Sequence, residues 1–182
     1  MSASRDGDSV DADLATWLDV MPVDVDPEVE AARQRIARIG RQFEQVLRRA
    51  AAQHELTVGD WQALSALHRS GEPYVLTPKE LTDLLSVTSG TISVRIDRLS
   101  KAGLVEPVAA TDGRSRPIRL TEKGRERWAA ATKMRTDYER EIFSDALREA
   151  ELAELNPLLR LLLSRFEQEF GRASAMDTLR TD

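Results

Sequence analysis

Short hydroxyl side chains and arginines gather in one stretch of the chain, between Ser86 and Thr121. The hydroxyl residues are Thr88, Ser89, Thr91 and Ser93. At a helix N-terminus, such small polar side chains allow a close approach to base edges and phosphates. The same stretch holds six basic residues, Arg95, Arg98, Lys101, Arg114, Arg116 and Arg119, and three acidic ones, Asp97, Glu106 and Asp112. Its local field is positive, so we interpret it as a nucleic-acid-binding surface.

Helix and turn signals around these residues predict a winged helix-turn-helix. Thr57 with Asp60 resembles a capping box, and Thr77 followed by Pro78 and Glu80 repeats the device. These signals predict helices over 58–70 and 78–85, and a third helix from Thr88 or Ser89 to Gly103. Short strands are expected over 105–108 and 118–120, with an Asp-Gly turn signal in the intervening tip. The fold class is mainly α with a small β-hairpin wing.

The third helix and the wing tip supply the candidate DNA contacts. Ile92, Ile96 and Leu99 form a buried stripe at helical spacing, which leaves the polar residues on the other faces. The expected DNA-binding residues are Thr88, Ser89, Thr91, Ser93, Val94, Arg98, Arg114, Ser115 and Arg116. An arginine at a hairpin tip can enter the minor groove or bind phosphate, and Asp112 can hold an arginine in position. The alternative is a solvated hairpin loop with no ligand.

Helices with apolar seams are expected on both sides of this lobe. Apolar residues at helical spacing predict a short helix over 14–21, a long helix that follows Asp26 and Pro27 and runs to about His54, and another ending near Phe170. Pro157 predicts a kink or restart in the last of these. The seams suit helix-on-helix packing, including packing between subunits. We therefore divide the chain into a disordered acidic tail (1–13), an N-terminal short helix and long dimerisation helix (14–56), the winged lobe (57–124), C-terminal dimerisation helices (125–172) and a flexible tail (173–182).

Composition excludes several function classes. The chain has no cysteine and two histidines fourteen residues apart, so thiolate chemistry and metal sites have no support. It also lacks a Gly-rich phosphate loop, so we expect neither an enzyme nor a cofactor. No apolar run is long enough to span a bilayer, and the polar, acidic N-terminus is unlike a signal peptide, which predicts a cytoplasmic protein. The net charge of −5 is misleading, because residues 1–30 carry −8 and the remainder +3.

At the wing, the phrase DGRSRPIRLTEKG resembles the MarR family of winged-helix transcriptional regulators, and the similarity extends from about Val29 to Phe170. The resemblance implies a homodimer whose first and last helices interlock, and two lobes on a pseudo-palindromic DNA operator. It also implies release of DNA when a small, often aromatic or anionic, effector binds. By the family pattern Arg114 is the minor-groove residue, and Asp112 orients it or an arginine of the recognition helix.

A narrower resemblance is to the urate-responsive subgroup, carried by the phrases GEPYVLTPKEL and SGTISVRIDRL and by an N-terminal helix with a Trp. Trp17 and Arg95 fall where the subgroup places two ligand-binding residues, while Gln62 and Pro107 replace an Asp and an Arg. The lost guanidinium and carboxylate argue against urate as the effector. Trp17, Gln62 and Arg95 are the candidate ligand-binding residues. Packing alone is the other interpretation of Trp17.

We therefore expect a ligand-responsive DNA-binding regulator, acting as a repressor. One rival is a winged-helix protein-interaction module or antirepressor without an effector, in which Arg114 and Arg116 would pair with an acidic partner. Another is a constitutive regulator, for which Gln62 and Pro107 mark a lost pocket. DNA binding that is sequence-specific and steeply salt-dependent separates the first expectation from the protein-interaction module.

Overall fold

The computed structural model describes residues 7–109 and 116–172. In those ranges the chain forms seven helices and one three-stranded sheet. The helices are α1 (Ser9–Asp19), α2 (Pro27–Gln53), α3 (Val58–Arg69), α4 (Pro78–Leu85), α5 (Ser89–Lys101), α6 (Glu122–Ala146) and α7 (Glu149–Phe170). The strands are β1 (Val75–Leu76), β2 (Val105–Pro107) and β3 (Ile118–Leu120). This is the expected mainly helical architecture with a small β wing.

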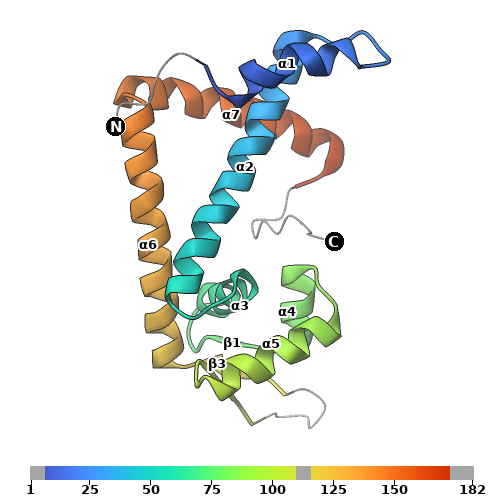
Figure 1. Ribbon diagram of the computed structural model, residues 1–182. Coiled ribbons are helices and arrows are strands. Elements are labelled where there is room, and N and C mark those ends of the chain that lie inside the picture. Colours follow the sequence, from blue (N-terminus) through green and yellow to red (C-terminus); the bar gives the residue numbers. More distant parts are fainter. Residues whose placement is uncertain (1–6, 110–115, 173–182) are drawn as a thin grey trace.

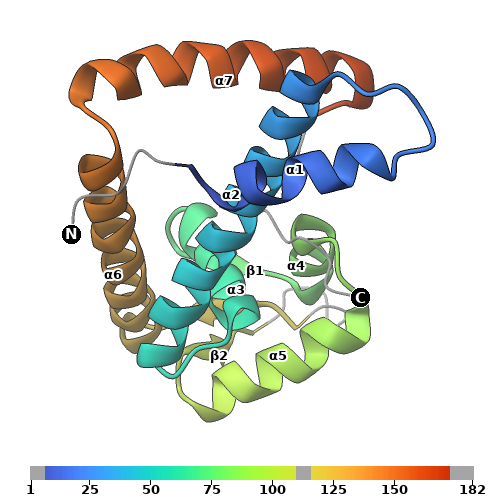
Figure 2. The same ribbon diagram turned by 45° about the horizontal axis from the view of Figure 1, so that its top comes forward.

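The molecule consists of a winged lobe, made by α3, α4, α5, the sheet and the first turns of α6, and a helical frame, made by α1, α2, α7 and the rest of α6. In Figures 1 and 2, α2 and α6 rise from the lobe, and α7 lies across their far ends. The long helices start where their caps require. Asp26 accepts the amide hydrogens of Glu28 and Val29 ahead of Pro27, and Thr121 accepts that of Gly124. The two long helices, α2 and α6, therefore connect the lobe to the distant part of the frame (Figures 1 and 2).

The lobe packs α3, α4 and α5 against the sheet and the first turns of α6. Its buried apolar residues include Leu64, Leu67, Leu81, Leu99 and Leu104, each at most 1% exposed. The sheet has the antiparallel order β1-β3-β2, with Val105 opposite Leu120 and Leu76 opposite Ile118. Such close packing holds α5 and the wing in fixed relative positions.

Two boundaries differ from the sequence-based expectation. β1 was not foreseen, because it is a two-residue strand that exists only through its pairing with β3. Helix α1 starts at Ser9, inside the stretch assigned to a disordered tail, because Asp8 caps it and shares a capping box with Asp11. Residues 9–13 of that stretch are therefore helical.

Pro157 does not restart the last helix, which runs through it as one element. A proline removes one backbone hydrogen bond to the residue four positions earlier. That residue, Ala153, is exposed, so its carbonyl oxygen can accept a hydrogen bond from water instead. The helix therefore tolerates the lost bond.

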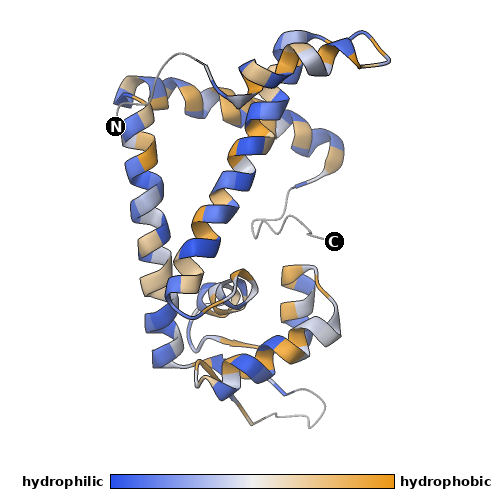
Figure 3. Cartoon of the chain, viewed as in Figure 1, coloured by the Kyte–Doolittle hydropathy of each residue, from blue (hydrophilic) through white to orange (hydrophobic). Residues whose placement is uncertain are grey.

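The frame leaves much apolar surface uncovered. None of the residues of α7 is buried, and the orange bands along it in Figure 3 mark its hydrophobic residues. On α2 the predicted seam is only partly filled. Val46 and Ala50 are buried, Phe43 stacks on Phe143 with ring centroids 6.0 Å apart, and Ile39 is 53% exposed. Helices α2 and α7 thus carry exposed apolar side chains that no other part of the described ranges covers.

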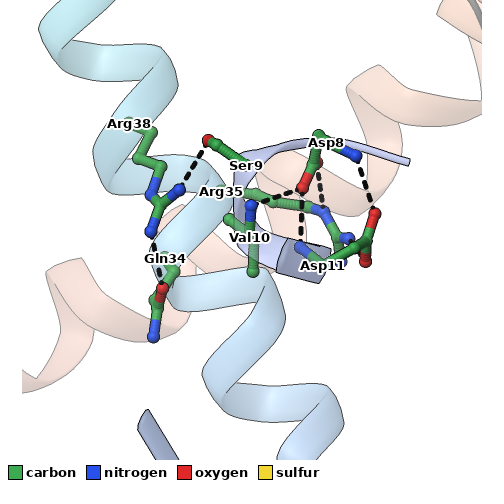
Figure 4. Close-up of polar contacts among 7 residues, drawn as sticks. All are labelled: Asp8, Ser9, Val10, Asp11, Gln34, Arg35 and Arg38. Carbon is green, nitrogen blue, oxygen red and sulfur yellow. Dashed lines mark hydrogen bonds and ion pairs between the residues drawn. The ribbon is translucent and has the colours of Figure 1, made fainter. Parts of the chain in front are cut away.

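The acidic α1 is held on α2 by ion pairs around one buried side chain. Asp8 and Asp11 pair with Arg35, and Asp13 pairs with Arg38, whose guanidinium nitrogen is 2.9 Å from the carboxylate. Val10 lies between them and is 1% exposed (Figure 4). Three acidic residues of this segment are therefore paired with arginines of α2.

Within the described ranges, no helix combines the length and apolar character that crossing a membrane requires. The same residues include no group of three or more His, Cys, Asp or Glu side chains that could hold a metal ion.

Candidate nucleic-acid interface

Local signals at α4 set the position of α5. The Thr77 hydroxyl oxygen accepts the amide hydrogen of Glu80, and the Glu80 carboxylate accepts the amide hydrogen of Thr77 at 2.7 Å. These bonds lower the pKa of Glu80 below its usual range. The helix ends at Ser86, which adopts a left-handed conformation with φ of 51°. Two residues later Thr88 caps α5, as the sequence predicts.

Helix α5 buries one stripe and exposes the rest. Ile92 and Leu99 are each 1% exposed and Ile96 packs against the core, as their spacing predicts. The opposite face lies on the outside of the lobe beside the wing strands (Figure 1). The residues exposed on α5 are Ser89, Gly90, Thr91, Ser93, Val94, Asp97, Arg98 and Lys101.

The hydroxyl groups of Thr88, Thr91 and Ser93 already have partners in the helix or its cap. Thr88 Oγ1 accepts the Thr91 amide hydrogen at 3.2 Å and lies 2.9 Å from Thr91 Oγ1. The Ser93 hydroxyl donates to the Ser89 carbonyl oxygen at 2.9 Å. These hydrogen bonds hold the short hydroxyl side chains close to the helix backbone, which favours a close approach of α5 to a DNA groove.

The structure places Arg98, expected among the DNA contacts, in a polar cluster that joins α3 to α5. Its Nε and Nη2 donate to one carboxylate oxygen of Asp60, at 3.1 and 2.5 Å, and its Nη2 also donates to the Thr57 hydroxyl. Asp60 is 3% exposed, and a buried carboxylate needs a partner of this kind. The side chain of Arg98 is half exposed, so the cluster sits at the edge of the outward face. We call Thr57, Asp60 and Arg98 the α3–α5 latch.

Arg95 lies beside this latch. A Cβ atom added to Gly59 would come within 2.3 Å of an Arg95 guanidinium nitrogen, so the guanidinium group lies against the Gly59 backbone. Partial burial lowers the pKa of Arg95, and the Asp60 carboxylate opposes that effect. Within the described residues, Arg95 Nη1 is buried and has no hydrogen-bond partner.

The wing is described as far as its strands. Glu106 on β2 pairs with Arg119 on β3 across the hairpin, at 2.6 Å. Arg116, two residues before β3, is exposed. Asp112, Arg114 and Ser115, which were expected at the tip, lie outside the described residues.

The three candidate ligand residues lie in different surroundings. Gln62 is buried and lines a cavity of about 590 Å³ between α2, α3 and α6. Trp17 lines a separate cavity of about 390 Å³ between α1 and α2. Arg95 lies beside the latch instead. The structure therefore does not bring the three side chains together around one cavity.

Two residues of the larger cavity were missed by the sequence analysis. The Arg135 guanidinium lies over the Trp61 ring, 5.1 Å from its centroid. The buried Arg135 Nε has no hydrogen-bond partner in the described part of the chain and lies 3.7 Å from a carboxylate oxygen of Glu139. Trp61 also donates a hydrogen bond to Thr132 at 2.9 Å. No spacing signal links two residues this far apart in sequence. An aromatic ring beside a guanidinium group with a free hydrogen-bond donor suits an anionic aromatic ligand.

Comparisons with known proteins agree with this arrangement. The model of the MarR family matches residues 54–115. An uncharacterised HTH-type transcriptional regulator of Bacillus cereus is 30% identical over 125 residues, which cover 69% of this chain and 82% of that protein. The HTH-type transcriptional regulator PecS of Dickeya dadantii is 27% identical over 154 residues, which cover 84% of this chain and 89% of PecS.

A solved structure shares the fold. A mutant of MarR from E. coli, crystallised with operator DNA, matches with a TM-score of 0.57 and 22% identity, covering 78% of this chain and 99% of that one. These proteins are regulators rather than enzymes, in agreement with the composition. The comparisons do not assign the chain to a urate-responsive subgroup, since PecS is a distant relative.

Proposed function

Because this chain belongs to the MarR family of transcriptional regulators, we propose that it is a cytoplasmic, sequence-specific DNA-binding repressor that works as a homodimer. The observation that carries the proposal is the outward face of α5. It is exposed, it starts with small hydroxyl residues and it lies beside the wing strands. A helix with these properties fits the major groove, while a basic wing reaches the adjacent backbone or minor groove. The similar E. coli MarR structure contains operator DNA, which supports this use of the fold.

The homodimer follows from the apolar frame. A two-fold pairing through α7 would cover the exposed leucines and set two α5 helices at a fixed separation. Two such helices suit a pseudo-palindromic operator with half-sites about one helical turn of DNA apart.

Mobility shifts with the DNA upstream of the coding region, repeated over a salt series, test this proposal. Sequence-specific binding that weakens steeply with salt is expected. Arg116→Ala should weaken binding to all sequences and reduce the salt slope by about 1, because it removes one phosphate contact. Arg140→Ala is the matched control, since that exposed arginine lies on α6 and away from the lobe surface. Binding that ignores both sequence and salt would instead support a protein-interaction module.

We further propose that a small aromatic anion controls DNA binding from the cavity between α2, α3 and α6. Three arginines (Arg41, Arg69 and Arg135) and two glutamates (Glu44 and Glu139) line it, together with Trp61 and Gln62. The excess positive charge and the ring under Arg135 favour a planar carboxylate.

The α3–α5 latch offers the route from this cavity to α5. Trp61 and Gln62 in the cavity wall directly follow Asp60, whose carboxylate holds Arg98. A ligand that shifts the start of α3 therefore shifts the anchor of α5 as well, which is the two-state element that coupling requires.

Thermal unfolding with benzoate, and with benzamide as the uncharged control of the same shape, tests the cavity. Benzoate at 100 times its dissociation constant should stabilise the protein by about 2.7 kcal/mol. Benzamide should not, and Arg135→Gln should abolish the effect of benzoate. Equal responses to the two compounds would remove the charged site, and no response to any aromatic anion would favour a constitutive regulator.

A further inference from the structure

We infer that Val94 makes this protein recognise the C5 methyl group of thymine, so that its operator is selected by an apolar contact on α5. The inference rests on the proposed DNA binding and names the base chemistry that is read. Val94 lies in the second turn of α5 and is 68% exposed, more than Leu84 at 49%, the other large apolar residue exposed on this helix pair.

The polar groups of the outward face are largely engaged within the chain. The Ser93 hydroxyl proton goes to the Ser89 carbonyl, and Thr88 and Thr91 share a hydrogen bond. Lys101 pairs with Asp97 at 2.7 Å, and Arg98 belongs to the latch. The exposed part of α5 also has no Asn or Gln, and its one exposed Arg is turned to Asp60. Bidentate readout of adenine or guanine therefore has little support on this helix.

Val94 is the one large apolar side chain exposed on α5. It projects beyond Gly90 and Thr91, which lie one turn earlier on the same side and are small. A β-branched side chain in a helix has one strongly preferred rotamer, so its two methyl groups keep a fixed direction and lose little entropy on contact. The major groove offers an apolar group of matching size only at thymine. Valine is also a poorer helix former than alanine, so an exposed valine here has no local structural advantage.

Replacing thymine by deoxyuridine tests the inference, because the two bases differ only by the C5 methyl group. Each thymine of a bound operator is replaced in turn, and affinity is measured for the full-length protein and for Val94→Ala. At one or two positions per half-site the wild type should lose about fourfold in affinity, the value of one buried methyl group. Val94→Ala should bind the thymine operator about as weakly and should not respond to the replacement.

Val94→Ala introduces the better helix former at an exposed site, so it should fold normally. Leu84→Ala is the matched control, because it truncates an exposed apolar residue on α4 and should keep the wild-type response to deoxyuridine. If wild type and Val94→Ala respond alike at every position, or neither responds, the thymine contact is overturned while DNA binding stands. If no DNA is bound specifically, it is the proposed function that fails.

Discussion

The winged lobe and α7 contain the same kinds of apolar residue, but the lobe buries them and α7 leaves them exposed. In the lobe, leucines such as Leu64, Leu81 and Leu99 are at most 1% exposed. On α7, Leu161 is 68% exposed and Phe170 is 78% exposed, and none of the residues of the helix is buried. Exposed apolar residues gathered on one helix in this way mark an interaction surface. One copy of the chain therefore completes the core of the lobe, whereas the apolar residues of α7 stay uncovered within the described ranges.

Placing a charge on α7 should have the largest effect on this contrast. Leu162 belongs to the apolar seam of the helix, and Leu162→Asp would put a carboxylate into a dry interface. A two-fold interface contains the substitution twice, so the penalty counts twice and the dimer should dissociate at micromolar concentration. Sedimentation equilibrium measures this change directly.

Ser164→Asp is the control for that experiment. It adds the same charge two residues further along α7, on the opposite side of the helix, and should leave the dimer intact. Dimerisation that survives Leu162→Asp, or a wild type that is monomeric at every concentration, would show that the seam has another role.

Truncating a side chain in the lobe core should lower the free energy of unfolding, and this loss should not depend on protein concentration. Leu64→Ala removes a fully buried side chain, and substitutions of this type lower the free energy of unfolding by about 2–5 kcal/mol. Urea unfolding followed by tryptophan fluorescence measures the loss. Leu84→Ala, at an exposed position of the same lobe, should stay within about 0.5 kcal/mol. A small effect of Leu64→Ala would mean that the lobe is less tightly packed than the contrast requires.

Local signals made the lobe predictable. Capping residues Thr57, Thr77 and Thr88 mark the starts of three helices, and each cap is confirmed. Asp60 was interpreted only as a capping partner, because its pairing with Arg98 depends on how α3 and α5 pack. The same reason hides Arg135 above Trp61 and the pairing of β1 with β3. Sequence patterns therefore identify helices and faces, whereas contacts between distant segments emerge only from the fold.

Substitutions in the α3–α5 latch test how firmly the lobe holds α5 in its orientation. Asp60→Asn keeps the shape of the side chain but removes the negative charge that pairs with Arg98. A buried hydrogen-bonding group left with an imperfect partner costs about 1–3 kcal/mol. We expect a loss of unfolding free energy in that range, together with weaker binding of operator DNA because α5 is less firmly oriented.

The Arg98→Gln variant separates these two effects. If the latch orients α5, then Arg98→Gln and Asp60→Asn should weaken DNA binding to a similar degree, and combining them should add little. If Arg98 contacts DNA directly, the Arg98→Gln variant should bind DNA much more weakly than the Asp60→Asn variant, and its binding should have a smaller salt slope.

The smallest effect is expected where α1 attaches to α2, since exposed ion pairs contribute little to stability. A hydrogen bond from Arg35 lowers the pKa of Asp8 from 3.8 to about 2, and the amide hydrogens of Asp11 and Val10 add to the shift. Because the folded pKa lies below the unfolded one, this stabilisation is present above about pH 4 and is lost as the pH falls towards 2. Amide hydrogen exchange of α1 should therefore accelerate on acidification and at high salt, while the buried lobe stays protected.

Arg35→Ala should make the exchange of α1 faster at neutral pH and remove most of its change between pH 4 and 2. Other carboxylates also titrate in this range, including Glu30 with a pKa of about 2, so the informative quantity is the difference between wild type and variant. Arg165→Ala, which breaks an exposed ion pair with Glu169 on α7, should leave α1 unchanged. If Arg35→Ala and wild type exchange alike at every pH, burial of Val10 alone holds α1 in place, and the frame depends on apolar contacts at this end too.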